Sequence, residues 1–355
     1  MAQNILVTGA AGYVGGSIFA DFLSRKGGPI KAAKIYAAVR SQDQVHPVSK
    51  LGINVIQIDL YDEKDVLESV LSNEIDIVVH AASSIVTPLA VNLIKALGKR
   101  REAGGKPTYL IHTSVATVFA EEAGWPYGQA KDDAPLFERE KELAAEYHPV
   151  RETNIAVVEQ AKANGVAAFN VALPTVYGRG TGAAKKLSVS IPAYVRVSMK
   201  HHIVHKFEKD GNPPGIHISD LTELYALIVE NILRQEPIPS GDKGYYFAVA
   251  HRVPWWRTMD SLAEHLYRRR LVAEPTPRIW PTYEMAADCL GFPAKYVRAM
   301  GSSTGDFVPV NGPRIGWQPK WDEKQYLESM DQEIQDVLDL DTLQPSLFNA
   351  LISPA

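Results

Sequence analysis

A glycine-rich turn near the N-terminus, "ILVTGAAGYVGG" (residues 5–16), constrains the fold of this chain more than any other feature. The turn places Gly9, Gly12 and Gly15 at intervals of three, directly after an apolar run and before a helical stretch. Between a strand and a helix, this spacing lets the chain turn tightly, brings backbone N–H groups close to a phosphate, and packs the helix against the strand. The turn therefore predicts a dinucleotide pyrophosphate site at the start of the first helix, held by these three glycines.

Up to residue 180, short apolar runs alternate with helical patterns. Several of these runs are nearly continuous in Val, Ile, Leu and Ala, which is typical of parallel strands buried on both faces. We expect strands at residues 4–10, 34–40, 54–60, 75–83, 108–114 and 167–174, and helices at 14–26, 62–72, 86–103 and 151–163. This alternation predicts an α/β fold with a Rossmann-type, doubly wound parallel sheet.

The pattern changes after residue 180. A glycine-rich loop (178–187) leads into mixed helix and polar loop, followed by a strand end with an amphipathic helix (215–233) and one more strand (244–250). We expect residues 1–180 to form the dinucleotide-binding domain, with 215–250 returning to it. Residues 181–214 and 251–355 are then expected to form a smaller substrate-binding lobe over the carboxyl edge of the sheet.

The charge and composition of the chain argue against several kinds of binding partner. The net charge is −4 and no basic block is present, which argues against nucleic-acid binding. The single cysteine, Cys289, cannot form an internal disulfide and fits a reducing compartment. No apolar run reaches the roughly 18 residues that span a bilayer. We therefore expect no membrane association and a cytoplasmic location. No metal site is expected either, because His201 and His205, four residues apart, lack a carboxylate that would complete one.

With the preceding Thr8, the glycine turn reads T-G-x-x-G-x-x-G and resembles the extended branch of the short-chain dehydrogenase/reductase superfamily, the NAD(P)-dependent epimerase/dehydratase-like proteins. The resemblance continues through "HAAS" (80–83), "LPTVYG" (173–178), "HISDL" (217–221) and "PRIGWQP" (313–319). It implies further cofactor contacts around the phosphates, the adenine and the nicotinamide. The residues that it implies are Thr8, Tyr13, Val14, Asp59, Leu60, Ala81, Ala82, Ser83, Thr113, Pro174 and Val176.

The second expected strand ends in Arg40 rather than in an acidic residue. An Asp or Glu at this place would accept hydrogen bonds from the ribose 2′-hydroxyl, whereas a guanidinium can pair with a 2′-phosphate through two N–H groups. Arg40 therefore favours NADP(H), and Asp43 nearby leaves NAD(H) as the alternative.

The catalytic pair of such enzymes is a Tyr and a Lys in the spacing Y-x-x-x-K, at the start of the helix before the sixth strand. The stretch "WPYGQAKDD" (125–133) contains Tyr127 and Lys131 in this spacing. The helix before the sixth strand is nevertheless expected at 151–163, where the pattern falls on Arg151 and Ile155. We interpret Tyr127 and Lys131 as a decoy, with the alternative that inserted sequence over 132–150 folds them back into the site.

The remaining catalytic positions are altered as well. In "HTSVATVF" (112–119) the usual catalytic hydroxyl falls on Val115, and we select Ser114 to hold a substrate oxygen, with a strand-capping hydroxyl as the alternative. The stretch "HPVRETN" (148–154) is similar to a subset of the extended branch with His and Arg at the helix start. The resemblance implies His148 as proton donor and Arg151 as the group that polarises a carbonyl or binds ribose, with a capping or surface histidine as the alternative.

Together these features predict an NADP(H)-dependent oxidoreductase that transfers hydride to or from a small carbonyl or alcohol substrate. Two alternatives stay open. One is an epimerase or dehydratase in which the hydride is returned, and the other is a dinucleotide-binding sensor or scaffold without chemistry. A homodimer is expected only by analogy with the superfamily.

Overall fold

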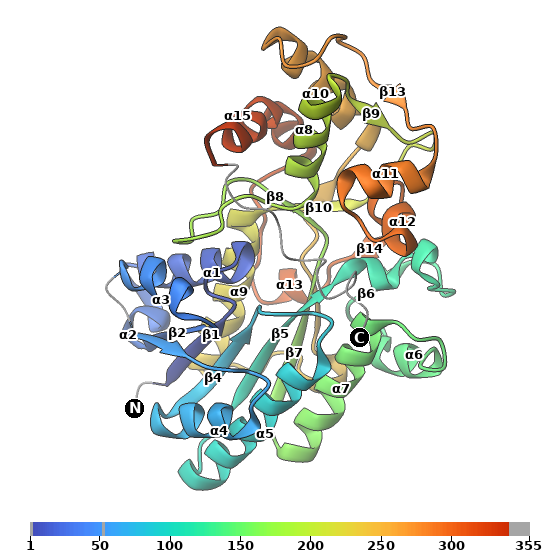
Figure 1. Ribbon diagram of the computed structural model, residues 1–355. Coiled ribbons are helices and arrows are strands. Elements are labelled where there is room, and N and C mark those ends of the chain that lie inside the picture. Colours follow the sequence, from blue (N-terminus) through green and yellow to red (C-terminus); the bar gives the residue numbers. More distant parts are fainter. Residues whose placement is uncertain (1–2, 52–53, 341–355) are drawn as a thin grey trace.

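The computed structural model describes residues 3–51 and 54–340, and its centre is a seven-stranded parallel sheet (Figure 1). The strand order is β11-β7-β5-β4-β1-β2-β3. The strands are β1 (Asn4–Thr8), β2 (Lys34–Val39), β3 (Asn54–Gln57), β4 (Ile75–His80), β5 (Tyr109–Val115), β7 (Ala167–Leu173) and β11 (Tyr245–Phe247). The chain builds the sheet outward from β1 in one direction and from β4 in the other, so the order reverses between these two strands. In doubly wound sheets, ligands bind at this reversal, outside the carboxyl ends of the strands.

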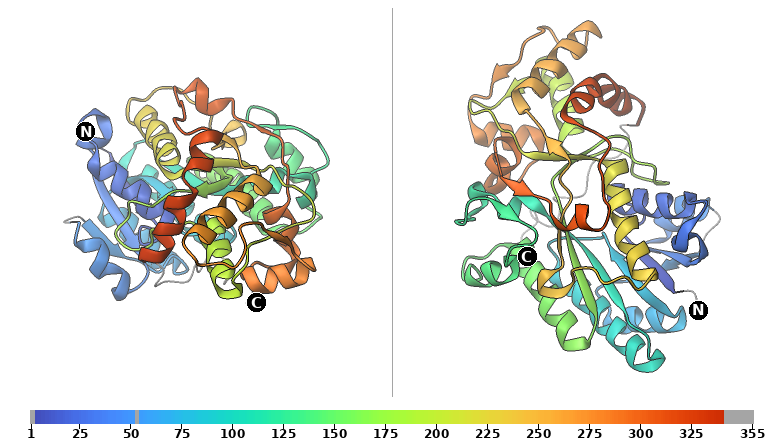
Figure 2. Two further views of the ribbon diagram at one scale, coloured as in Figure 1. Left: turned by 90° about the horizontal axis from the view of Figure 1, so that it is seen from above. Right: turned by 180° about the vertical axis from the view of Figure 1, so that it is seen from behind.

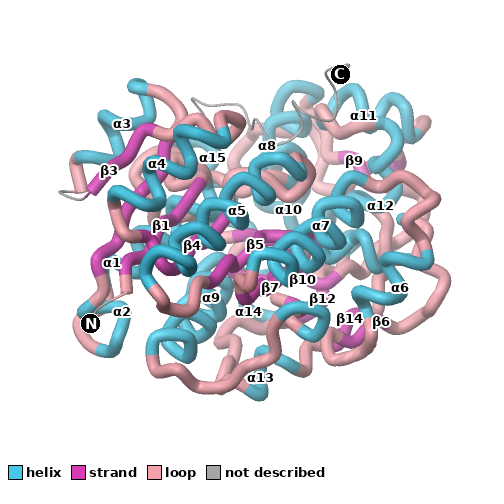
Figure 3. The backbone as a smooth tube through the Cα atoms, turned by 90° about the horizontal axis from the view of Figure 1, so that it is seen from below, coloured by secondary structure: helices cyan, strands magenta, loops and turns pink. Residues whose placement is uncertain are grey.

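Helices cover both faces of the sheet, and strands are visible between them from below (Figure 3). One face carries α1 (Tyr13–Ser24), α2 (Gly28–Ala32) and α9 (Ile218–Leu233), which contact one another. The other carries α4 (Glu63–Ser72), α5 (Thr87–Gly104) and α7 (Pro149–Asn164). Helix α3 (Gln42–Ser49) lies beside β2 and β3.

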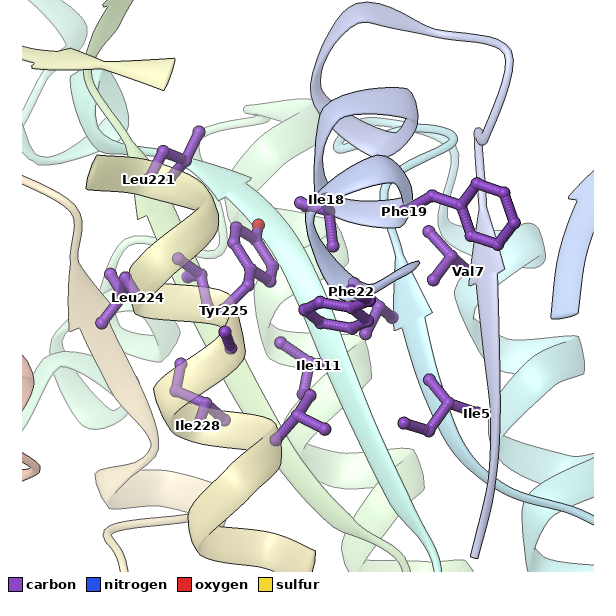
Figure 4. Close-up of a cluster of buried hydrophobic side chains, with 14 of the residues drawn as sticks. Ile5, Val7, Ile18, Phe19, Phe22, Ile111, Leu221, Leu224, Tyr225 and Ile228 are labelled. Atoms are coloured by element: carbon purple, nitrogen blue, oxygen red, sulfur yellow. The ribbon is translucent and has the colours of Figure 1, made fainter. Parts of the chain in front are cut away.

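Successive side chains of a strand belong in turn to two separate hydrophobic clusters, one on each face of the sheet. In β1, Ile5 and Val7 join the cluster under α1 and α9, whereas Leu6 joins the cluster under α5 and α7. Figure 4 shows the first cluster, where Phe22 of α1 and Tyr225 of α9 lie near each other above the strands. Since both faces are apolar, the strands read as continuous hydrophobic runs, which is why the sequence indicates them clearly.

The predicted α/β fold with a Rossmann-type sheet is confirmed. The differences lie at the ends of elements and in two short helices, α2 and α3, that the sequence analysis does not expect. The strand expected at residues 4–10 ends at Thr8, because Gly9 adopts a left-handed φ of +68°. The helix expected at 151–163 begins earlier, at Pro149, and ends at Gly165 in the left-handed conformation, as the "NG" stop indicates.

A smaller lobe lies over the carboxyl edge of the sheet (Figures 1 and 2). It has its own hydrophobic cluster, formed largely by α8 (Ser190–His201), α10 (Trp255–Arg268) and α15 (Met330–Leu340). Its other helices are α11 (Tyr283–Leu290), α12 (Val297–Gly301) and α14 (Glu323–Glu328). Small sheets formed by β8 (Thr175–Tyr177), β10 (Pro214–His217) and β12 (His251–Arg252), and by β9 (His205–Lys206) with β13 (Arg278–Ile279), complete it. In the part of the chain described, no helix has the length and apolar character needed to cross a bilayer.

One C-terminal segment packs beside the main sheet instead of within the lobe's cluster. Strand β14 (Phe307–Val308) pairs with β6 (Ala130–Lys131), and α13 (Asn311–Arg314) lies against β11. Helix α6 (Leu136–Glu142) and the short 3-10 helices Ala116–Phe119, Glu121–Ala123, Gly241–Lys243 and Ala294–Tyr296 are the remaining elements. The domain limits expected from the sequence stay a prediction, and their last part, 341–355, lies outside the described residues.

Candidate cofactor and active site

The ends of β1 and β4 meet at a turn that requires glycine. Gly9 has a φ of +68°, and the Gly12 N–H donates to the Gly9 carbonyl oxygen at 2.7 Å. A Cβ on Gly9 would lie 2.5 Å from the carbonyl oxygen of Ala81, and a Cβ on Gly15 would lie 2.5 Å from that of Gly9. Both neighbours are backbone atoms, which cannot move aside cheaply. The spacing of the glycines therefore reflects close approach of three backbone segments.

The turn leads directly into the N-terminus of α1. Gly12 precedes the helix and provides no side chain that could cap its first N–H groups. Such groups have no partner within the helix and attract anions. The turn and the helix start therefore fit the pyrophosphate of a dinucleotide. Tyr13 and Val14 of the first turn are half-buried, and the Tyr13 hydroxyl donates to the Gly178 carbonyl oxygen at 2.7 Å.

Buried polar contacts hold the two strand ends together behind this turn. Thr8 Oγ1 lies 2.9 Å from His80 Nδ1 and accepts a hydrogen bond from the Ala81 N–H at 3.2 Å. Burial lowers the pKa of His80 to about 4, so its imidazole is neutral at pH 7. The ring of His112 on β5 stacks against it at 5.6 Å. Thr8 therefore acts on the site by positioning Ala81 against Gly9.

The expected adenosine contacts lie at the carboxyl ends of β2 and β3. Arg40 is exposed, and its backbone N–H donates to Gln44 Oε1 at 2.9 Å. Asp59 is also exposed, and its N–H donates to Asp65 Oδ2 at 2.8 Å, while Leu60 is half-buried. The local backbone is thus fixed by side-chain acceptors, and Arg40 stands at an anchored strand end.

Beyond Ala81, the chain leaves β4 toward α5. Ala82 is exposed, and Ser83 Oγ accepts hydrogen bonds from the N–H groups of Ile85 and Val86 at 3.2 and 3.1 Å. The Ser83 hydroxyl therefore shapes the start of α5.

The expected nicotinamide contacts come from β5 and the β7–β8 connection. Pro174 is half-buried between these strands, and Val176 pairs with Ile216 of β10. The Thr113 and Tyr225 hydroxyls are 2.7 Å apart, which links β5 to α9. The residues that we expected around a nicotinamide dinucleotide are therefore distributed along the carboxyl edge of the sheet.

The hydroxyl of Ser114, near the end of β5, is buried and does not face this edge. Ser114 is 1% exposed, and its Oγ has no hydrogen-bond partner among the described residues. Alternation along the strand places Ser114 on the same face as Leu110, toward α5 and α7. The next residue, Val115, packs against an apolar cluster that includes Val150 of α7. A substrate would reach Ser114 only if the surrounding side chains moved.

His148 is the residue that precedes α7. It is half-buried, its side chain makes no capping hydrogen bond, and its Nδ1 has no partner in the described part of the chain. The ring of Tyr296 lies 5.8 Å away. Burial, followed by the charges of Arg151 and Lys295, lowers the pKa of His148 to about 4. At pH 7 this side chain is neutral, so it can form hydrogen bonds but is not an imidazolium acid.

Arg151 lies in the first turn of α7, and its guanidinium contacts the connection that precedes this helix. It is 2% exposed, and its Nη1 donates to the carbonyl oxygens of Leu143 and Glu146, both at 3.1 Å. Burial lowers the pKa of Arg151, and the nearby charge of Glu140 opposes this effect. These contacts make Arg151 an anchor for the preceding loop.

Tyr127 and Lys131 do not share a helix. Tyr127 lies in a loop and its hydroxyl donates to the Glu142 carboxylate, which raises the pKa of Tyr127. Lys131 is exposed on β6, which pairs with Phe307–Val308. A Y-x-x-x-K pair requires both side chains on one helical face, and the structure does not bring these two together in that way.

Comparison with known proteins identifies the family. Residues 5–238 match the model of the NAD dependent epimerase/dehydratase family. The chain belongs to this family. It is an enzyme of the extended short-chain dehydrogenase/reductase type, and a nicotinamide dinucleotide is the typical cofactor of that family. No curated protein matches the chain in sequence.

The similar solved structures share the fold at low identity. Vestitone reductase from alfalfa is 17% identical, with a TM-score of 0.60 over 95% of this chain and 99% of that one. UDP-glucose 4-epimerase from Thermotoga maritima is 12% identical, with a TM-score of 0.63 over 95% and 100%. A partial consensus L-threonine 3-dehydrogenase is 13% identical, with a TM-score of 0.62 over 94% and 99%. Their chemistries differ, so the likeness establishes the fold alone.

The sequence analysis assigns no role to several residues at the carboxyl edge of the sheet. His80 and His112 are register partners on β4 and β5, and each follows an apolar run, which is the signal that could have paired them. The Gly178 N–H donates to Glu333 Oε1 at 2.6 Å, so the C-terminal helix α15 contacts the loop beside Tyr13. No local pattern marks Glu333, because this contact joins distant parts of the chain.

Proposed function

We propose that the chain is an NADP(H)-dependent oxidoreductase that transfers hydride to or from a small carbonyl or alcohol substrate beneath the C-terminal lobe. The observation that carries the proposal is Arg40 at the end of β2. Its guanidinium is exposed and forms no ion pair with a carboxylate in residues 3–51 or 54–340. A guanidinium at this strand end suits a 2′-phosphate, whereas an acidic residue would repel it.

The chain's own residues bind and orient in this proposal. Gly9, Gly12 and Gly15 allow the α1 N-terminus to approach the pyrophosphate, and Pro174 and Val176 flank the nicotinamide. The cofactor, when bound, supplies or accepts the hydride. Orientation by such fixed backbone accounts for much of what an enzyme adds to cofactor chemistry.

His148 is half-buried, whereas Ser114 and Arg151 are buried, so His148 is the one of these three that we assign to the substrate. With a pKa of about 4, His148 would orient a substrate oxygen by hydrogen bonding at neutral pH rather than release a proton to it. Arg151 fixes the loop before His148 through its hydrogen bonds to two carbonyl oxygens of that loop.

The test is fluorescence titration of the purified protein with NADPH and NADH, for the wild type and Arg40→Ala. A charge-assisted pair contributes about 1.5–3 kcal/mol, so we expect NADPH to bind roughly 10–100-fold more tightly than NADH. Arg40→Ala should remove most of this preference and leave NADH binding unchanged. Equal binding of both cofactors by the wild type, or tighter binding of NADH, would contradict the NADP(H) assignment.

Turnover then separates the classes of function. NADPH oxidation with any member of a panel of aldehydes and ketones supports an oxidoreductase. His148→Ala should lower kcat while NADPH binding stays intact, and an unchanged kcat would exclude His148. Formation of a product isomer without net NADPH consumption would indicate an epimerase instead.

A further inference from the structure

The backbone of Gly178 is held from two sides by helices that lie far apart in the sequence. From one side, the Tyr13 hydroxyl of α1 donates to the Gly178 carbonyl oxygen at 2.7 Å. From the other, Glu333 Oε1 of α15 accepts a hydrogen bond from the Gly178 N–H at 2.6 Å. Figure 1 shows the loop that follows β8 between α15 and α1. Gly178 therefore connects the C-terminal helix with the helix that we assign to the pyrophosphate.

Beyond Gly178, the loop continues along α1. A Cβ on Gly180 would lie 2.9 Å from the Tyr13 ring, so the loop backbone packs directly on this ring. The Thr181 N–H donates to Ser17 Oγ at 3.2 Å, and Ser17 Oγ donates to the Tyr13 carbonyl oxygen at 2.7 Å. The Gly180 N–H donates to the Lys186 carbonyl oxygen at 2.8 Å, which closes the loop. The segment 178–186 is therefore docked on the first two turns of α1.

Two buried carboxylates of α15 hold the start of this loop. Glu333 is 4% exposed and Asp336 is 2% exposed. Asp336 Oδ1 pairs with Arg179 Nη1 at 3.1 Å, next to the bond from Glu333 to Gly178. Ile334 and Val337 of the same helix belong to the hydrophobic cluster of the C-terminal lobe. Helix α15 is therefore anchored in the lobe, and its carboxylates join the lobe to the loop.

Tyr13 passes this contact on to the cofactor turn. It stands in the first turn of α1, whose N–H groups we assign to the pyrophosphate. Burial, followed by the charge of Glu333, raises the pKa of Tyr13, so its hydroxyl stays protonated and remains a donor to Gly178. If the loop left α1, the Tyr13 hydroxyl would lose its acceptor and the helix start would lose its cover.

We propose that Glu333 is a positioning residue of the dinucleotide site: it holds the backbone of Gly178 against Tyr13 and so keeps the loop 178–186 docked on α1. This inference rests on the placement of the dinucleotide at the start of α1 in the proposed function. A cofactor that favours the docked loop must by linkage also favour the docking of α15. Because α1 is assigned to the pyrophosphate, which NADPH and NADH share, Glu333 acts on both cofactors alike, unlike Arg40.

The experiment measures NADPH and NADH binding by fluorescence for Glu333→Ala, Glu333→Gln and Asp339→Ala. Burial raises the pKa of Glu333 to about 7, so the titrations are made at pH 8, where its carboxyl is ionised. We expect Glu333→Ala to weaken the binding of both cofactors about tenfold, because the docked loop becomes a minor population. Glu333→Gln keeps an oxygen that accepts from the Gly178 N–H and should stay within about threefold of the wild type.

Asp339→Ala is the matched control on the same helix. Asp339 is exposed, and its carboxylate accepts a hydrogen bond from Gln335 Nε2 at 2.8 Å, away from the loop. This variant should bind both cofactors as the wild type does.

Two further measurements separate positioning from a merely structural role. Tyr13→Phe removes the hydroxyl on the other side of Gly178 and should weaken both cofactors as Glu333→Ala does. The double variant should then lose little more than either single variant, since both act through the same loop. Saturating NADPH should also slow amide hydrogen exchange in 178–186 and in 330–340 of the wild type, but only in 178–186 of Glu333→Ala.

Cofactor binding by Glu333→Ala equal to that by Asp339→Ala would overturn the inference. Fully additive effects of Glu333→Ala and Tyr13→Phe would overturn it as well, because the two side chains would then act independently. The NADP(H) assignment is tested separately, since Arg40→Ala should weaken NADPH binding alone. A wild type that binds neither cofactor would overturn both the function and this inference.

Discussion

Gly9 combines a left-handed backbone conformation with a close backbone neighbour in the cofactor site. In Gly9→Ala, a φ of +68° would be imposed on a residue with a Cβ, and that Cβ would lie 2.5 Å from the carbonyl oxygen of Ala81. Strain of this kind costs about 1–3 kcal/mol. Separation of the two backbones should also weaken NADPH binding by tenfold or more. Urea denaturation and fluorescence titration measure the two effects.

Gly105→Ala is the matched control for the backbone conformation. Gly105 ends α5 with a φ of +65°, but a Cβ there would have no neighbour within 4 Å. This variant should lose only about 1 kcal/mol, the cost of the left-handed conformation, and bind NADPH normally. If both variants lost stability and binding equally, the close approach of Gly9 to Ala81 would not be what the site requires.

Among elements, β6 shows why a correct spacing can mislead. The sequence places Tyr127 and Lys131 four residues apart, but this spacing brings two side chains together only on a helix. Lys131 lies instead on β6, which forms because Phe307–Val308 pairs with it. That partner lies far along the chain, so no local pattern announces it. The parallel strands of the main sheet, by contrast, are buried on both faces and could be predicted from apolar runs alone.

The orientation of Ser114 could not be predicted for a related reason. The strand "YLIHTSV" does not alternate between polar and apolar residues, so its sequence leaves open which residues face which layer. The position of α7 was accessible, because the "NG" stop and the apolar periodicity are local signals. The burial of Arg151 was not, since it depends on carbonyl groups of the preceding loop.

Asp132 joins three elements, β6, β11 and α13, through backbone hydrogen bonds. Its Oδ1 accepts from the N–H groups of Val310 at 2.7 Å and Asn311 at 3.0 Å, and its Oδ2 accepts from that of Phe247 at 2.9 Å. In Asp132→Asn, an amide NH2 would face at least one of these N–H groups in either orientation. We expect a loss of about 1–3 kcal/mol in the free energy of unfolding at pH 8.

The neighbouring Asp133→Asn is the control for this prediction. Asp133 forms an ion pair with the exposed Arg314 at 2.8 Å, and such pairs contribute about 0–1 kcal/mol. Urea denaturation of both variants at the same pH provides the comparison. A loss at Asp132 no greater than that at Asp133 would mean that the three elements are held together without this carboxylate.

At the scale of the whole molecule, two opposing sets of buried groups set the dependence of stability on pH. Burial lowers the pKa of His80, His148 and His217 to about 4, below the ordinary 6.5. Between pH 4 and 6.5 the unfolded chain therefore binds more protons at these sites, so they make stability rise with pH. Burial raises the pKa of Glu140 and Glu333 to about 7, and these carboxyls have the opposite effect.

The histidines stop contributing only above about pH 7.5, where the folded and the unfolded chain both hold them neutral. Glu140 and Glu333 lose protons in the folded state around pH 7, whereas in the unfolded chain they are already ionised. Between pH 6.5 and 8.5 the two carboxyls together should lower stability by about 1–2 kcal/mol, which offsets most of the gain from the histidines, so the stability of the wild type should change little over this range. Glu140→Gln and Glu333→Gln should each remove about half of the carboxyl contribution and make stability rise more with pH, whatever their effect on absolute stability. Urea denaturation across this range measures the slopes.

Glu138→Gln, an exposed glutamate on the same helix as Glu140, should leave the slope unchanged. A slope that neither buried substitution changes would show that neither carboxyl stays protonated in the folded chain.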